Sequence, residues 1–143
     1  MTWQDCLGKS VILTHNHRMN RILIAGSGDI ALRFARNLSG NQRLFGLLRN
    51  PARQAELRAA GITPLMGDLD KPRSLHRLGG LAHTVLHFAP PPTAAPESGD
   101  AKRTPLVDTR TRNLLAALSQ GKLPRRLIYI STRACTVTVM VQS

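Results

Sequence analysis

A glycine-rich turn constrains this chain more than any other feature of its sequence. Residues 26–31 read Gly-Ser-Gly-Asp-Ile-Ala, which is a G-x-G-x-x-A motif. The motif directly follows the apolar run 22–25, which has the composition of a buried strand. Beyond the turn, apolar residues recur at helical spacing, at Ile30, Ala31, Phe34, Ala35 and Leu38. This order predicts a strand, a tight turn and a helix packed back on the strand.

Each glycine of the motif has a physical role in such a unit. Gly26 permits the tight turn, Gly28 lets the backbone come close to a pyrophosphate, and Ala31 lets the helix pack near the sheet. The helix N-terminus adds backbone N–H groups and a partial positive charge, both of which favour phosphates. The motif therefore predicts a site for the phosphates of a dinucleotide. A tight turn that binds no ligand is the alternative.

Strand and helix patterns keep alternating after this first unit. The expected strands are 21–25, 44–48, 62–66, 84–88 and 127–130, and Pro64 favours an edge position for the third. The expected helices are 30–38, 51–60, 70–78 and 107–120, and a proline-rich loop covers 90–105. Alternation of this kind predicts an α/β fold, a doubly wound parallel sheet that is incomplete, with about five strands in the order 3-2-1-4-5.

The end of the second expected strand bears on which dinucleotide is bound. An NAD site usually places an acidic residue there for the ribose 2′-hydroxyl, but none lies between Asp29 and Glu56. Arg49 stands at this position, and Arg53 follows one turn into the next helix. A guanidinium pairs well with a 2′-phosphate, so the sequence favours NADP over NAD. An ordinary exposed arginine at position 49 is the alternative.

The formal net charge of +12 raises nucleic acid as a partner. The basic residues are scattered along the sequence, however, and only 3% of residues are aromatic, which leaves little for base stacking. We therefore expect an arginine-rich solvated surface and regard nucleic acid as the less favoured partner.

The sequence gives little support for a membrane span, for secretion, or for a metal or redox site. No apolar run reaches the length of about 18 residues that a membrane span needs. Cys6 and Cys135 are far apart and form no metal or redox spacing, and no signal peptide precedes them, which favours the cytoplasm. His15 and His17 have no clustered third ligand, so no metal site is expected.

From about Met19 to Thr132 the chain resembles the N-terminal part of an extended or atypical short-chain dehydrogenase/reductase, of the NAD(P)-dependent epimerase/dehydratase type. The resemblance implies a Rossmann-type sheet. The pieces that carry it are Gly26 to Ala31, Gly46 to Asn50, Gly67 to Leu69, His87 to Pro90, Asn113 to Leu115 and Ile130 to Thr132. Their order and spacing together make the likeness.

The resemblance implies roles for residues outside the glycine turn. Asp68 and the backbone of Leu69 would lie beside the adenine, although a turn or capping aspartate is the alternative for Asp68. The residues after the fourth strand would line the central ribose and the nicotinamide, and Thr132 would help to polarise a small-molecule substrate. His87 is expected to be a packed strand histidine. The candidate cofactor-binding residues are Gly26, Ser27, Gly28, Asp29, Ile30, Arg49, Asp68, Leu69, Phe88, Ala89 and Pro90.

The chain departs from this family at the catalytic pair. The family's proton transfer uses Tyr-x-x-x-Lys, in which the lysine lowers the pKa of the tyrosine phenol. The one tyrosine here is Tyr129, and Arg133 stands four residues later. The pair is therefore absent, and whether the chain is an enzyme stays open.

The two ends of the chain fit the family pattern poorly. We divide the chain into an N-terminal extension (1–18), a partial NAD(P)-binding domain (19–132) and an aberrant tail (133–143). Met19 could be the natural start of the protein, or residues 1–18 could be a true leader, and the sequence leaves both possibilities open. Plausible codons for the tail, shifted by two bases, encode Val-Tyr-Gly-Asp, which the family carries at this place. We therefore expect a frame-shifted tail, with a genuine β-rich tail, 136–141, as the alternative.

Three functions compete on the sequence alone. The first is an NAD(P)-binding oxidoreductase or epimerase-like protein that is catalytically incomplete. The second is a non-enzymatic NADP(H)-binding regulator, which the same fold can support. The third is a basic nucleic-acid-binding module, which would bind with a steep salt dependence and without regard to NADPH.

Overall fold

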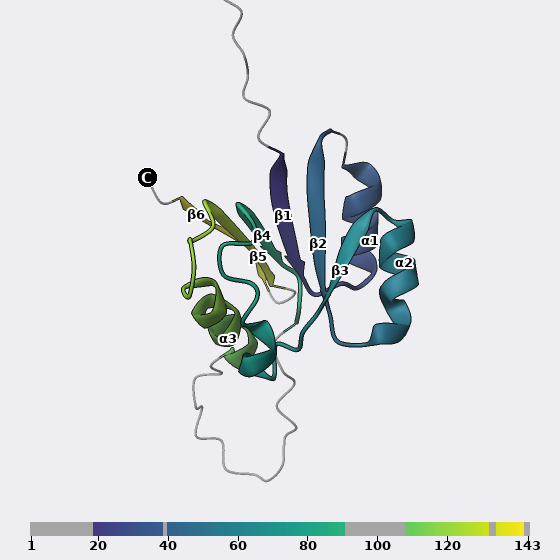
Figure 1. Ribbon diagram of the computed structural model, residues 1–143. Helices are drawn as coiled ribbons and strands as arrows, with labels where there is room; N and C mark the ends of the chain where they lie inside the picture. The colour runs from purple at the N-terminus through teal and green to yellow at the C-terminus, as the bar shows by residue number, and fades with distance from the viewer. Residues whose placement is uncertain (1–18, 39, 91–107, 132–133, 142–143) are drawn as a thin grey trace, which may run out of the picture.

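The computed structural model describes residues 19–38, 40–90, 108–131 and 134–141 (Figure 1). The strands are β1 (Asn20–Ala25), β2 (Gln42–Leu48), β3 (Ile62–Met66), β4 (Thr84–His87), β5 (Arg126–Ser131) and β6 (Ala134–Val141). The helices are α1 (Asp29–Asn37), α2 (Gln54–Ala59) and α3 (Thr109–Leu118), with short 3-10 helices at Pro51–Arg53 and Pro72–Leu75. The N-terminal extension, Thr132 and Arg133 lie outside the described residues.

The strands form one sheet in the order β3-β2-β1-β4-β5-β6. The first five are parallel, which confirms the predicted order 3-2-1-4-5. β6 adds a sixth strand that runs antiparallel to β5. The tail therefore forms a strand, as its composition allows, and β3 with Pro64 lies at the opposite edge, as predicted.

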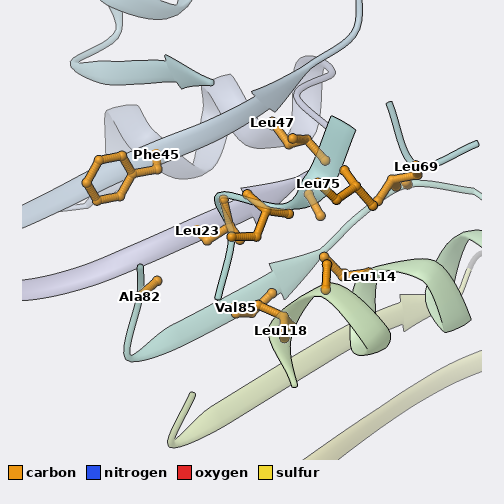
Figure 2. Packing of buried hydrophobic residues seen from close by; sticks show 13 residues of the cluster. Leu23, Phe45, Leu47, Leu69, Leu75, Ala82, Val85, Leu114 and Leu118 are labelled. Carbon is orange, nitrogen blue, oxygen red and sulfur yellow. The ribbon is translucent and has the colours of Figure 1, made fainter. Parts of the chain in front are cut away.

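Helices cover both faces of the sheet, so the fold is doubly wound. On one face α1 and α2 bury a core of aliphatic side chains that includes Ile24, Ala31 and Leu57. On the other face α3 and the segment around Leu75 cover a second core, centred on Leu23, Val85 and Leu114 (Figure 2). Side chains of successive strand residues alternate between the two cores because of the strand period of two.

This winding creates the position of a site. The chain leaves β1 towards the face of α1, and it leaves β4, the neighbouring strand, to return on the face of α3 (Figure 1). Because the helices that follow these two adjacent strands lie on opposite faces, the carboxyl ends of β1 and β4 form a topological switch point, which is where open α/β sheets form their binding crevice.

Two details differ from the sequence prediction. Ile30, expected on the apolar face of α1, is 53% exposed, and Leu32 takes the buried position instead. Ile30 is the second residue of the helix, which begins at the carboxyl edge of the sheet after β1. The expected helix 70–78 is reduced to one 3-10 turn at Pro72–Leu75, because Gly79 and Gly80, with φ +73° at Gly80, form the turn into β4.

Two kinds of feature are absent from the described part of the chain. No helix there is long and apolar enough to cross a membrane. No group of three or more histidine, cysteine, aspartate or glutamate side chains there is placed to hold a metal ion.

Candidate functional site

A cleft of about 500 Å³ opens at the carboxyl edge of the sheet. It is formed by the turn after β1, the end of β2 and the segments that follow β3 and β4, with one residue from α3. Every residue that the sequence predicted to bind a cofactor lines it. The lining residues are Gly26, Ser27, Gly28, Asp29, Ile30, Leu47, Leu48, Arg49, Asn50, Arg53, Gly67, Asp68, Leu69, Asp70, Phe88, Ala89, Pro90 and Arg110.

The glycine turn is held tightly between the ends of β2 and β4. Gly26 has φ +99°, and a Cβ built there would lie 2.5 Å from the backbone nitrogen of Ala89. The hydroxyl of Ser27, which is buried, donates a hydrogen bond to the carbonyl of Leu47. Gly26 is therefore required both by its backbone conformation and by the close approach of the chain after β4.

Gly28 is a glycine for a different reason. It precedes α1 as its N-cap with φ −89°, a conformation open to any residue, and no side chain caps the helix. A Cβ at this position would meet no atom within 4 Å. The space above the first turn of α1 is therefore open, and it faces backbone N–H groups at the positive end of the helix dipole. A phosphate group fits this cradle in both size and charge.

Two arginines stand at the end of β2. Arg53 is engaged by the protein, because its Nη1 donates to the carbonyl of Ser27 at 3.2 Å and its Nε lies 2.8 Å from Oε2 of Glu56. Arg49 is exposed and, within the described ranges, has no ion pair. Its charge contributes to lowering the pKa of Asp70, after the larger effect of Arg110, so the guanidinium stands near the mouth of the cleft. Arg49 is the arginine at the end of β2 that remains available to an anion.

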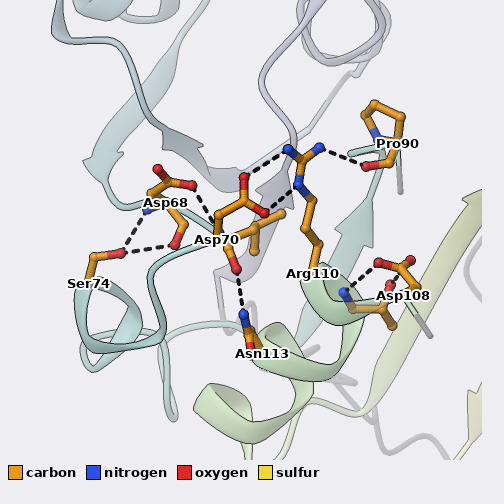
Figure 3. Close-up of polar contacts among 9 residues, drawn as sticks. Asp68, Asp70, Ser74, Pro90, Asp108, Arg110 and Asn113 are labelled. Carbon is orange, nitrogen blue, oxygen red and sulfur yellow. Dashed lines mark hydrogen bonds and ion pairs between the residues drawn. The ribbon is translucent and has the colours of Figure 1, made fainter. Parts of the chain in front are cut away.

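The wall after β3 is a network of turns and one ion pair (Figure 3). Asp68 accepts a hydrogen bond from the backbone of Asp70 at 2.9 Å, so the turn role considered for Asp68 is present in the structure. Arg110 contacts both carboxylate oxygens of Asp70 at 2.8 Å and donates to the carbonyl of Pro90 at 3.0 Å. The hydrogen bond from Arg110 holds the pKa of Asp70 below its usual value. Arg110 thereby joins the wall after β3 to the wall after β4.

α3 is tied to the same wall by Asn113. Its side-chain amide donates to the carbonyl of Leu69 at 2.8 Å (Figure 3). This bond fixes the backbone at position 69. The part of the cleft wall at Asp68 and Leu69 is therefore held by α3 as well as by the turn that Asp68 forms with Asp70.

A chain of polar side chains, buried at His87 and partly exposed at its other members, lies beneath the wall after β4. Nε2 of His87 is 2.8 Å from Oγ1 of Thr111, whose hydroxyl donates to Asp108, and the hydroxyl of Tyr129 donates to the same carboxylate at 3.2 Å. Because the Thr111 proton goes to Asp108, the imidazole donates from Nε2–H. His87 is fully buried and its ring packs edge-on to Tyr129 at 5.1 Å, which confirms the packed histidine expected at this position.

Burial sets the protonation of this chain. Burial lowers the pKa of His87, against the charge of Asp108, so the imidazole is neutral at pH 7. Burial alone would raise the pKa of Asp108, but the hydrogen bonds from Thr111 and Tyr129 outweigh it and lower the pKa. Asp108 is therefore an ionised cap of α3, and its role is structural.

Sequence reasoning missed Asp70, Arg110 and Asp108 as parts of this region. Asp70 and Arg110 are far apart in the chain, and no local pattern links them. Asp108 was detectable in principle, since an aspartate before a helix pattern is a typical N-cap, but the proline-rich segment before it obscured the helix start. Thr132, the candidate catalytic residue, lies outside the described residues.

Comparison with known proteins supports the fold. No family model matches the sequence, and no curated protein does either. Saccharopine dehydrogenase (L-Glu forming) from Saccharomyces cerevisiae matches 78% of this chain with a TM-score of 0.56 at 16% identity. An NADPH-dependent quinone oxidoreductase, QOR2 from Escherichia coli, solved with NADPH, matches 76% with a TM-score of 0.51 at 19% identity. AtPrR2, solved with NADP+ and (+)pinoresinol, matches 76% with a TM-score of 0.50 at 18% identity.

These likenesses concern the fold alone. The chain spans 22% of the length of the first of these proteins and 35% of the other two. The described residues thus form a Rossmann-like α/β fold that matches NAD(P)-binding proteins over about three quarters of this chain.

Proposed function

We propose that this chain binds NADP(H) in the cleft at the carboxyl edge of the sheet, as the cofactor-binding part of a reductase-like protein of the short-chain dehydrogenase/reductase type. The observation that carries the proposal is the open space above Gly28 at the uncapped N-terminus of α1. A helix start whose N–H groups face open space is suited to a pyrophosphate.

Different groups of lining residues would contact successive parts of the dinucleotide. Gly26 to Ile30 would hold the pyrophosphate, and the backbone of Leu69 with Asp68 would flank the adenine. Phe88, Ala89 and Pro90 would face the central ribose and the nicotinamide. Arg49 would pair with the 2′-phosphate, because Arg53 is already held by Ser27 and Glu56. This assignment favours NADP over NAD.

The reaction, if there is one, needs groups beyond these residues. A bound nicotinamide supplies hydride transfer, but the chain carries no Tyr-x-x-x-Lys pair for the accompanying proton. A role for Thr132 in polarising a substrate belongs to the same proposal. A non-enzymatic NADP(H)-binding regulator remains the second candidate, and the uncapped α1 supports it equally.

The sharpest test is Gly28→Asp. The backbone at position 28 accepts any residue and its Cβ meets nothing, so the variant folds, and aspartate is a good N-cap. Its carboxylate would occupy the cradle and repel the pyrophosphate. We expect NADPH affinity, measured by titration calorimetry, to fall more than about tenfold, which is about 1.4 kcal/mol.

Gly28→Asn is the matched control, because it caps the helix without the charge. NADPH binding by Gly28→Asn should fall between the wild type and Gly28→Asp. Failure of the wild-type chain to bind NADPH or NADP+, or equal binding by wild type and Gly28→Asp, would contradict the proposal.

The choice of dinucleotide is tested by Arg49→Gln. Loss of a charge-assisted hydrogen bond costs about 1.5–3 kcal/mol. We therefore expect about a tenfold or greater loss in affinity for NADPH with almost no change for NADH, both read from the same titrations. An equal change for the two nucleotides would remove Arg49 from the 2′-phosphate site.

A further inference from the structure

Carboxylates are confined to one of the two edges of the sheet in the part of the chain that the structure describes. Among the described residues every carboxylate belongs to the carboxyl edge, where strands end and helices begin: Asp29, Glu56, Asp68, Asp70 and Asp108. At the amino edge, where strands begin, the charged side chains of the described residues are basic. Arg21 and Arg43 begin β1 and β2, and Arg125 and Arg126 stand at the start of β5. The basic residues that look scattered in the sequence thus gather, in part, on one edge.

Backbone hydrogen bonds fix three of these arginines around one residue. The backbone N–H of His83 donates to the carbonyl of Arg21 at 2.9 Å. The carbonyl of His83 accepts from the backbone N–H groups of Arg125 at 2.7 Å and Arg126 at 3.2 Å. The starts of β1, β4 and β5 are therefore locked together, and their arginines are held at a set spacing.

Arg43 extends this row onto the next strand. It lies opposite Arg21 in the register of β1 and β2, and its guanidinium stands over the ring of Phe45, 5.6 Å from the centroid. By the strand alternation Arg21 and Arg43 lie on the face of α3, on the same side as Leu23 and Phe45. Arg126 lies on the other face, with Ile128, so the row continues around the edge of the sheet at β5. With adjacent strands about 4.8 Å apart, the row from β2 to β5 extends about 14 Å.

Helix dipoles account for some of the segregation but not for this row. Asp29 and Glu56 lie in first turns of helices, and Arg36 and Arg58 lie in last turns, where their charges offset the dipoles. The four arginines of the row begin strands, which have only small dipoles. Within the described ranges no carboxylate pairs with them, since the ion pairs there join Arg53 to Glu56 and Arg110 to Asp70. Their mutual repulsion is left unbalanced.

We propose that this row, Arg21, Arg43, Arg125 and Arg126, binds the phosphate backbone of duplex nucleic acid without sequence preference. Duplex DNA carries one phosphate per about 3.4 Å of helix axis on each strand, so a row of about 14 Å is long enough to contact several phosphates. Phe45, the aromatic residue beside the row, is 7% exposed and lies under Arg43. Without an exposed ring to stack bases, the row suits a backbone better than a single strand.

The test compares two triple variants of equal charge by anisotropy of a labelled DNA duplex over a range of salt concentrations. Arg43→Gln/Arg125→Gln/Arg126→Gln removes exposed members of the row. Arg33→Gln/Arg73→Gln/Arg112→Gln removes exposed arginines from α1, the Pro72–Leu75 turn and α3. We expect the row variant to flatten the slope of log affinity against log salt by about 3, since each contact contributes about 1. The matched variant should change the slope by less than about 1.

Several outcomes would overturn the proposal. The first is absence of duplex binding by the wild type at low salt. The second is an equal loss of affinity in the two variants, which would indicate an effect of net charge alone. The third is tighter binding to a single strand or to polyglutamate than to duplex. If the row variant fails to fold, Arg43→Lys/Arg125→Lys/Arg126→Lys retains the charge, and it should retain duplex binding. Saturating NADPH should leave duplex affinity unchanged, because the cleft lies at the other edge, and displacement by NADPH would place the duplex in the cleft instead.

Discussion

The helices α1 and α3 begin at the same edge of the sheet in opposite chemical states. α1 begins after Gly28, without a side-chain cap and beneath open space. α3 begins after Asp108, whose carboxylate accepts from the backbone N–H of Thr111 at 3.1 Å and from the hydroxyls of Thr111 and Tyr129. One helix start is left for a ligand, whereas the other is satisfied by the protein itself.

The contrast between the two helix starts shows how residues for binding and residues for stability can be separated within the carboxyl edge of one sheet. The cap of α3 joins β4, α3 and β5 through His87, Thr111, Asp108 and Tyr129, so it holds the far half of the sheet together. The start of α1 contributes its N–H groups to no side chain. Changes at α3 should therefore affect folding, and changes at Gly28 should affect binding.

The largest effect should come from Gly26→Ala, which attacks the turn that leads into α1. A positive φ costs an alanine about 1–2 kcal/mol, and the Cβ would lie 2.5 Å from backbone, which adds about 1–3 kcal/mol. We expect the free energy of unfolding, from urea titration, to fall by about 2–5 kcal/mol. Gly61→Ala is the matched control, because Gly61 has φ +77° with no atom near its Cβ. Equal losses in the two variants would mean that the contact with Ala89 costs nothing.

A smaller effect is expected from Asp108→Ala. Loss of the cap and of the hydrogen bonds from Thr111 and Tyr129 should destabilise the chain by about 1–2 kcal/mol in the same titrations. Asp108→Asn, which retains an acceptor, should lose less. NADPH affinity of the folded fraction should be almost unchanged in both variants.

The pH dependence provides an internal check on this variant. Because the folded pKa of Asp108 is lowered, its contribution is fully present above the unfolded value of about 3.9, and it is lost as pH falls through the folded value. The difference in unfolding free energy between wild type and Asp108→Ala should therefore shrink below about pH 4. A difference that stays constant with pH would show that the carboxylate charge has no part in the cap.

The smallest expected change in the free energy of unfolding comes from a variant at the start of α1. Gly28→Asp adds to α1 the kind of cap that α3 already has, so the free energy of unfolding should stay equal or rise by a few tenths of a kcal/mol. Thermal unfolding followed by circular dichroism measures this change. A clear loss of stability would mean that position 28 serves the fold and would weaken the separation of the two helix starts.

Local patterns in the sequence were sufficient to predict most of the fold. The apolar run before Gly26, the helical spacing after it and Pro64 in an edge strand are all short-range signals, and the structure confirms the strand order they predict. The helix expected between Asp70 and Gly79 is shorter than predicted, a single 3-10 turn at Pro72–Leu75, because a proline and two glycines lie within a few residues of one another. Ile30 was misassigned because helical spacing alone does not say where the sheet ends beneath the first turn.

The site was less accessible to sequence reasoning. The glycine turn was found because its spacing reflects backbone geometry. Asp70 and Arg110 meet only through the fold, and the cap at Asp108 is recognisable only once the start of α3 is known. The row of arginines at the amino edge has no sequence signature at all, since its members come from three strands.

The divergence of the chain after β1 and β4 has a consequence for tolerance to substitution. The cleft lies where the helices after β1 and β4 take opposite faces, so its position is set by the fold and most lining side chains can change without moving it. Tight constraint falls on a few positions, such as Gly26, where the chain itself comes too close for a Cβ. A sequence can drift far while this shape persists, which agrees with structural likeness at 16–19% identity in a chain that no family model matches.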